Sequence, residues 1–71
     1  MQIEWENGFV LRATDRNGEI VLSGNPAGLR SLAGILMALA EESAGSHVHL
    51  DVYNALEEGS RELILERTDE E

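Results

Sequence analysis

The sequence predicts an α+β domain in which four antiparallel strands form one sheet and a single helix covers one face of it, in the order β-β-α-β-β. Three patterns support this: two-residue apolar alternation in both halves of the chain, a three- and four-residue apolar period between them, and turn signals at the boundaries. With 71 residues the chain has room for one thin core. We expect a single domain over residues 1–67 and an acidic tail over residues 68–71.

The first strand is expected over residues 2–13. Its apolar positions share one face and are Ile3, Trp5, Phe9 and Leu11. Asn7-Gly8 is also a hairpin signal, but a hairpin there would place carboxylates on the core face. We therefore predict one long strand with a bulge at Gly8.

A hairpin turn is predicted at residues 15–18, whose sequence is Asp-Arg-Asn-Gly. The second strand follows this turn, and Ile20 and Leu22 are expected to face the same side as Phe9 and Leu11.

A helix is expected to begin at Pro26. Asn25 is a good N-cap because its side chain accepts a bond from a free backbone N–H, and proline has no N–H to leave unpaired. Ile35 and Met37 flank an apolar stripe that we expect to cover the sheet. The stripe consists of Leu29, Leu32, Ala33, Leu36, Leu39 and Ala40. The last turn contains two carboxylates, Glu41 and Glu42, which oppose the helix dipole by about 0.3–1 kcal/mol each.

Two more strands are predicted after the helix, over residues 47–53 and 61–67. The first places Val48, Leu50 and Val52 on the core side, and the second places Leu63 and Leu65 there. If every strand is antiparallel to its neighbours, the strand order is 2-1-3-4. The helix covers one face of this sheet and leaves the other face uncovered.

Composition and charge limit the classes of function that we expect for this chain. Five arginines and no lysines oppose fourteen acidic residues, so the net charge is −9, which disfavours nucleic acid and favours a basic protein partner. The absence of cysteine excludes thiol chemistry, and no serine lies in a nucleophile motif. We expect a cytoplasmic protein with no membrane segment, no cofactor and no enzymatic activity.

A His-x-His pair, His47 and His49, is the main candidate for ligand chemistry. Side chains two apart on a strand point the same way, so both imidazoles could bind one metal ion. A neighbouring strand would have to supply the third ligand, from Glu62, Glu66, Glu4 or Glu6. We favour hydrated surface histidines, and we keep a small metal-binding module or metal-dependent enzyme as the alternative function.

Two surfaces are candidates for partner binding. The uncovered sheet face mixes apolar and charged groups, which suits protein contact. Its candidate residues are His47, His49, Asp51, Tyr53, Glu62, Ile64 and Glu66. The second surface is the solvent side of the helix, where small residues would allow another backbone to approach. Its candidate residues are Ala27, Ser31, Gly34 and Ala38, with Glu41 and Glu42 beyond them. A structural homodimer through either surface is a further alternative.

Two segments resemble a known family. Residues 24–33, GNPAGLRSLA, and residues 45–51, GSHVHLD, are similar to a small immunity-protein family of bacterial polymorphic toxin systems. The resemblance extends from the first strand to Glu66. It implies a cytosolic protein that binds and neutralises a cognate toxin, often a nuclease, by steric and electrostatic occlusion. It assigns no toxin-contacting residue.

Overall fold

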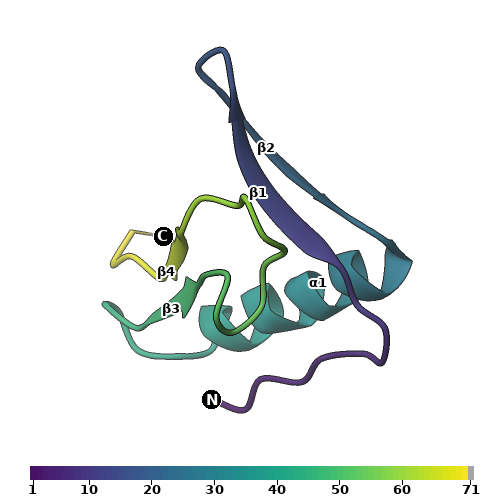
Figure 1. Cartoon of the computed structure of the whole chain (residues 1–71). Coiled ribbons are helices and arrows are strands. Elements are labelled where there is room, and N and C mark those ends of the chain that lie inside the picture. Colours follow the sequence, from purple (N-terminus) through teal and green to yellow (C-terminus); the bar gives the residue numbers. More distant parts are fainter. Residues whose placement is uncertain (71) are drawn as a thin grey trace.

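The computed structural model describes residues 1–70 and is α+β, with the predicted element order (Figure 1). The predicted tail residue Glu71 lies outside the described residues. The elements are β1 (Leu11–Arg16), β2 (Glu19–Gly24), α1 (Pro26–Ala40), β3 (His47–Leu50) and β4 (Leu63–Glu66).

The strands form two separate two-stranded sheets, so the prediction of one four-stranded sheet with the order 2-1-3-4 is wrong. β1 pairs antiparallel with β2, and β3 pairs antiparallel with β4. The free edge of β1 is instead covered by the loop at residues 57–61. In that loop the N–H of Glu57 donates to the Leu11 carbonyl at 2.9 Å, and the N–H of Arg61 donates to the Ala13 carbonyl at 2.7 Å.

The first ten residues form an irregular arm along α1 and not the first part of a long strand, as we had predicted. We call residues 1–10 the N-terminal arm. Its chain turns at Asn7-Gly8, where the N–H of Phe9 donates to the Glu6 carbonyl at 3.2 Å and Gly8 has φ +76°. The turn stacks the Trp5 and Phe9 rings, whose centroids are 4.5 Å apart.

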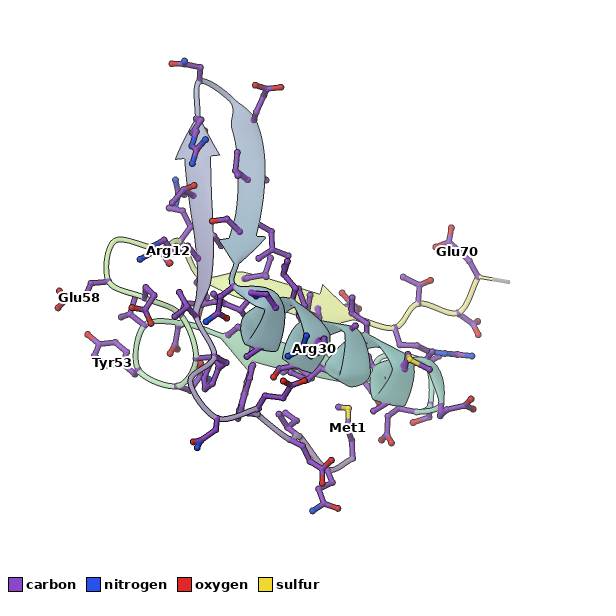
Figure 2. All side chains as sticks on the ribbon, turned by 90° about the vertical axis from the view of Figure 1, so that its right-hand side faces the viewer. Met1, Arg12, Arg30, Tyr53, Glu58 and Glu70 are labelled. Atoms are coloured by element: carbon purple, nitrogen blue, oxygen red, sulfur yellow. The ribbon has the colours of Figure 1, made fainter. Side chains whose placement is uncertain are left out.

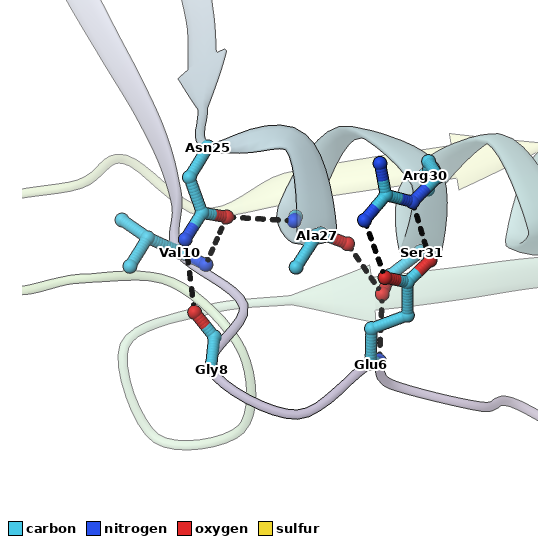
Figure 3. Close-up of polar contacts among 8 residues, drawn as sticks. Glu6, Gly8, Val10, Asn25, Ala27, Arg30 and Ser31 are labelled. Atoms are coloured by element: carbon cyan, nitrogen blue, oxygen red, sulfur yellow. Dashed lines mark hydrogen bonds and ion pairs between the residues drawn. The ribbon is translucent and has the colours of Figure 1, made fainter.

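The arm is bound to α1 by polar contacts at Glu6. Its backbone N–H donates to the buried Ser31 Oγ at 2.9 Å, and its carboxylate accepts two hydrogen bonds of 2.9 Å from the Arg30 guanidinium (Figure 3). The hydrogen bonds from the Arg30 guanidinium, together with its charge, hold the pKa of the Glu6 carboxyl below its ordinary value.

The predicted hairpin turn between β1 and β2 is confirmed. Asn17 and Gly18 both have positive φ, as a two-residue type I′ turn requires, and the Asp15 carboxylate accepts the N–H of Gly18 at 3.0 Å. The register sets Ala13 opposite Leu22, so Leu22 does share a face with Leu11. Ile20 is nevertheless 79% exposed because the tip of the hairpin extends beyond the core.

Asn25 joins the start of the helix to the start of β1. As predicted, its side chain caps α1 by accepting the N–H of Gly28, at 2.8 Å. The same Oδ1 accepts the N–H of Val10 at 3.0 Å, and Nδ2 donates to the Gly8 carbonyl at 2.9 Å (Figure 3). The backbone N–H of Asn25 donates in turn to the Val10 carbonyl at 3.2 Å.

The buried face of α1 is rotated from the predicted stripe. Leu29 and Leu36 are 47% and 45% exposed, whereas Gly28 and Ser31 are buried. The cause is the N-terminal arm, which covers the flank of the helix that we had assigned to solvent. The core consists of Leu11, Ala13, Leu32, Ile35, Leu39, Val48, Leu50, Ala55 and Leu56, with Trp5, Phe9, Leu63 and Leu65 packed against it.

Both C-terminal strands are shorter than predicted. β3 ends at Leu50, so Val52 does not face the core. The chain turns there because the Asp51 carbonyl accepts the N–H groups of Ala55 and Leu56, at 3.0 and 2.8 Å. This turn buries Ala55 and Leu56, which occupy core positions that the sequence pattern did not indicate.

Gly28 and Gly34 make a matched test of this packing. A Cβ at Gly28 would collide with the Val10 carbonyl, whereas a Cβ at Gly34 would meet no atom within 4 Å. We expect Gly28→Ala to lower the free energy of unfolding by about 1–3 kcal/mol. Gly34→Ala should raise it by up to about 1 kcal/mol, because alanine favours the helix. Urea denaturation followed by circular dichroism measures both, and a Gly28→Ala variant as stable as wild type would contradict the close approach.

Acid should loosen the N-terminal arm. Because the folded-state pKa of Glu6 lies below its ordinary value of 4.5, the Arg30 pair stabilises the folded state above about pH 4.5 and is lost as the pH falls through the lowered pKa. Trp5 is the only tryptophan of the chain, so its fluorescence reports on the arm. We expect an emission change below pH 4.5 in wild type and none in Glu6→Gln, whose side chain does not titrate. An emission change at the same pH in both proteins would show that another carboxylate causes it.

Candidate partner-binding surface

The outward face of β3 and β4 brings together most of the candidate residues of the sheet. The register places His47 opposite Glu66 and His49 opposite Ile64. All four side chains are exposed, and Ile64 is 52% exposed although it is aliphatic. Strand alternation produces this face, because Val48, Leu50, Leu63 and Leu65 point the other way, toward the core. The result is an apolar centre bordered by imidazoles and carboxylates.

The two histidines lie close together on this face. Their ring centroids are 5.0 Å apart in an edge-to-face arrangement, and His47 Nδ1 lies 3.1 Å from the Gly45 carbonyl. His49 Nδ1 lies 3.9 Å from the Glu62 carboxylate, at the limit of an ion pair. Within residues 1–70 no group of three or more His, Cys, Asp or Glu side chains is placed to hold a metal ion. The face presents charged and hydrogen-bonding groups to solvent.

Asp51 and Tyr53 do not lie on the strand face where we expected them. The Asp51 carboxylate accepts the N–H of Tyr53 at 2.9 Å, which makes it part of the turn after β3. Asn54 completes the turn, since its Oδ1 accepts the Asp51 N–H and its Nδ2 donates to the His49 carbonyl, both at 2.8 Å. Tyr53 is 94% exposed and projects into solvent from this loop (Figure 2).

The second candidate surface, the small residues on the outer side of the helix, is already partly covered by the protein itself. Another backbone does approach it, but that backbone is the chain's own N-terminal arm, bound through Ser31. Gly34 is exposed and Ala38 is half-buried. Glu41 is the C-cap residue, and the Glu42 carboxylate lies 3.8 Å from the amino group of Met1. This surface therefore includes the arm, which was not part of the prediction.

A groove between the N-terminal arm and α1 was missed by the sequence analysis. It has a volume of about 640 Å³, and its lining includes Glu4, Trp5, Arg30, Gly34 and Ile35. The signal that could have revealed it was Asn7-Gly8, a turn that folds the chain back along the helix. Arg30 lies on the outer side of α1 in Figure 2, beside this groove.

No helix within the described residues 1–70 is long and apolar enough to span a membrane.

Comparison with known proteins identifies a family. The model of the family described as Immunity protein 32 matches residues 19–68, from the start of β2 to two residues beyond β4. This confirms the resemblance carried by residues 24–33 and 45–51. The match includes α1 and the β3–β4 face and leaves out the N-terminal arm. No curated protein and no solved structure matches the chain. The protein belongs to the immunity protein 32 family.

Proposed function

We propose that this protein binds a toxin protein and neutralises it by covering the surface with which the toxin acts, without any turnover. Membership of the immunity protein 32 family is the observation that carries the proposal. The structure offers a consistent means, since the β3–β4 face is exposed, lies within the matched residues and carries groups suited to protein contact.

The charge of the chain supports a basic toxin. Fourteen acidic residues against five arginines give a net charge of −9, which attracts a cationic protein over a distance of about one Debye length, roughly 8 Å at physiological salt. Such attraction raises the association rate. A toxin that acts on nucleic acid needs a basic surface for phosphate, and an acidic domain covering that surface would exclude the substrate.

The primary test pairs the protein with the toxin domain encoded beside its gene. We expect cells producing that toxin to survive when they also produce this protein, and the purified pair to form a complex. Because the attraction is electrostatic, affinity should fall by at least about tenfold between 50 and 500 mM salt. Survival assays and isothermal titration calorimetry measure these outcomes. If the adjacent toxin is neither bound nor neutralised, the proposal is wrong.

A charge reversal identifies the face that binds. We expect Glu62→Arg together with Glu66→Arg to weaken toxin binding by about tenfold or more, or about 1.4 kcal/mol, because both carboxylates border Ile64. The matched control reverses Glu57 and Glu58, two exposed carboxylates of the loop before β4, and changes the net charge equally. Glu58 projects from that loop (Figure 2). Equal losses in both double variants would show that net charge alone acts and that the β3–β4 face is not the contact.

A further inference from the structure

One edge of β4 carries unpaired backbone groups. β4 has β3 on one side and no strand on the other within residues 1–70. Hydrogen-bonded pairs alternate along an antiparallel ladder, and the bond from the Arg67 N–H to the Ser46 carbonyl at 2.9 Å fixes which pairs they are. Leu63 and Leu65 therefore bond to Leu50 and Val48. The N–H and C=O groups of Ile64 and Glu66 point to the outer edge.

The corresponding edge of β3 is less open. Its outward carbonyl at His49 already accepts a hydrogen bond from the Asn54 side chain, at 2.8 Å. No backbone hydrogen bond outside the ladder reaches Ile64 or Glu66 from the described part of the chain. An unpaired strand edge is a template for another strand, and proteins commonly protect such edges. β4 has neither a proline nor a bulge; its four-residue length and the carboxylates of Glu62 and Glu66 are what limit pairing to a strand of matching charge.

The side chains along this edge specify the chemistry of an added strand. Glu62, Ile64 and Glu66 alternate along one face, so a strand paired with β4 would set a residue opposite each of them. Carboxylates are best paired with Arg or Lys, and an exposed isoleucine with an apolar residue. At the start of β4 lies a hollow of about 160 Å³, in which Ile20 and Leu63 offer apolar contact beside the charged Asp15, Arg61 and Glu62.

We propose that the toxin is bound by strand addition: an extended toxin segment with a basic–x–apolar–x–basic pattern pairs antiparallel with the outer edge of β4. Main-chain hydrogen bonds at Ile64 and Glu66 supply the pairing, and the alternating side chains supply the selectivity. This inference rests on the proposed function and names the surface and the binding mode that serve it.

A second copy of this chain is the competing occupant. Residues 61–67 read Arg-Glu-Leu-Ile-Leu-Glu-Arg, which is the same in both directions, so two β4 strands could pair about Ile64 with two-fold symmetry. That register would set Glu62 opposite Glu66 of the other copy, and like charges directly opposite each other destabilise a sheet. Each copy also has a net charge of −9. Charge complementarity therefore favours a basic strand.

Backbone amide exchange tests the edge directly in the full-length protein. The probe is a capped peptide, Thr-Arg-Thr-Val-Thr-Arg-Thr, with Thr-Glu-Thr-Val-Thr-Glu-Thr as its control. In the free protein the amides of Ile64 and Glu66 should exchange fast, while those of Leu63 and Leu65 are protected. Saturating basic peptide should slow exchange at Ile64 and Glu66 by about tenfold. Unchanged exchange, or the same slowing with the control peptide, would overturn the inference.

Two variants at Ile64 distinguish the contribution of its backbone N–H from that of its side chain. Ile64→Pro removes the outward N–H without removing a bond to β3, and proline is tolerated on edge strands. Ile64→Ala keeps the N–H and shortens the side chain. We expect peptide-induced protection of Glu66 to persist in Ile64→Ala and to vanish in Ile64→Pro. Protection that persists in a folded Ile64→Pro protein would place the peptide elsewhere. The exchange measurement on wild type stands independently if this variant does not fold.

The same amides distinguish failure of this inference from failure of the proposed function. If the toxin binds and Ile64 and Glu66 remain unprotected, strand addition is wrong and toxin neutralisation stands. If the basic peptide protects them and the adjacent toxin does not bind, the edge is a strand-binding site and the proposed function is wrong. Protection that grows with protein concentration alone would identify a second copy as the occupant and overturn the choice of toxin.

Discussion

The side-chain amide of Asn25 bonds to backbone on both sides of the β1–β2 hairpin. It caps α1 at Gly28, and it bonds to Val10 and Gly8 before β1 begins. These bonds close the loop between the two ends of the hairpin and bring the helix onto the chain that enters it. Gly28 makes the approach geometrically feasible, since a side chain there would meet the Val10 carbonyl. The positions of the arm, the hairpin and the helix all follow from this junction.

Contacts with the helix and with one loop stabilise the two small sheets. A two-stranded antiparallel pair is marginally stable alone, and a strand of four residues, such as β4, offers few hydrogen bonds. The loop at residues 57–61 links the two sheets by bonding to the edge of β1. Val48 and Leu50 then pack with Leu32, Ile35 and Leu39 of α1. Because the loop covers β1 and ends before β4, the edge of β4 is left without a partner.

Local chemistry in the sequence predicted the local structure well. The N-cap at Asn25, the start of α1 at Pro26 and the turn at Asn17-Gly18 were all predicted correctly, because each depends on groups close in sequence. The exposed positions of His47, His49 and Ile64 were also predicted, since alternation within a strand fixes them. The prediction of a single sheet was wrong because strand pairing depends on residues that are distant in sequence. Ser60 and Arg61 both bond to Ala13, and the apolar alternation in β1 does not indicate that these bonds form.

The first ten residues show how one pattern can describe two structures. Apolar residues at Ile3, Trp5 and Phe9 fit a strand, but the same spacing also suits an arm that sets Trp5 and Phe9 against a helix. Asn7-Gly8 decided the outcome, because the positive φ of Gly8 turns the chain before a strand can form. The helix stripe was rotated for the same reason: Ser31 lies under the arm, and Leu36 is left exposed.

In the proposed complex, the net charge of the chain and the backbone groups at the edge of β4 contribute to recognition in different ways. A net charge of −9 acts over long range and speeds encounter, but it is spread over many side chains and fixes no orientation. Backbone groups at Ile64 and Glu66 have a fixed direction because the β3–β4 ladder holds them. A strand that slips by one residue would turn its apolar side chain away from Ile64 and its cations away from Glu62 and Glu66. Long-range attraction therefore brings a basic toxin to the domain, and the register at β4 selects which of its segments binds.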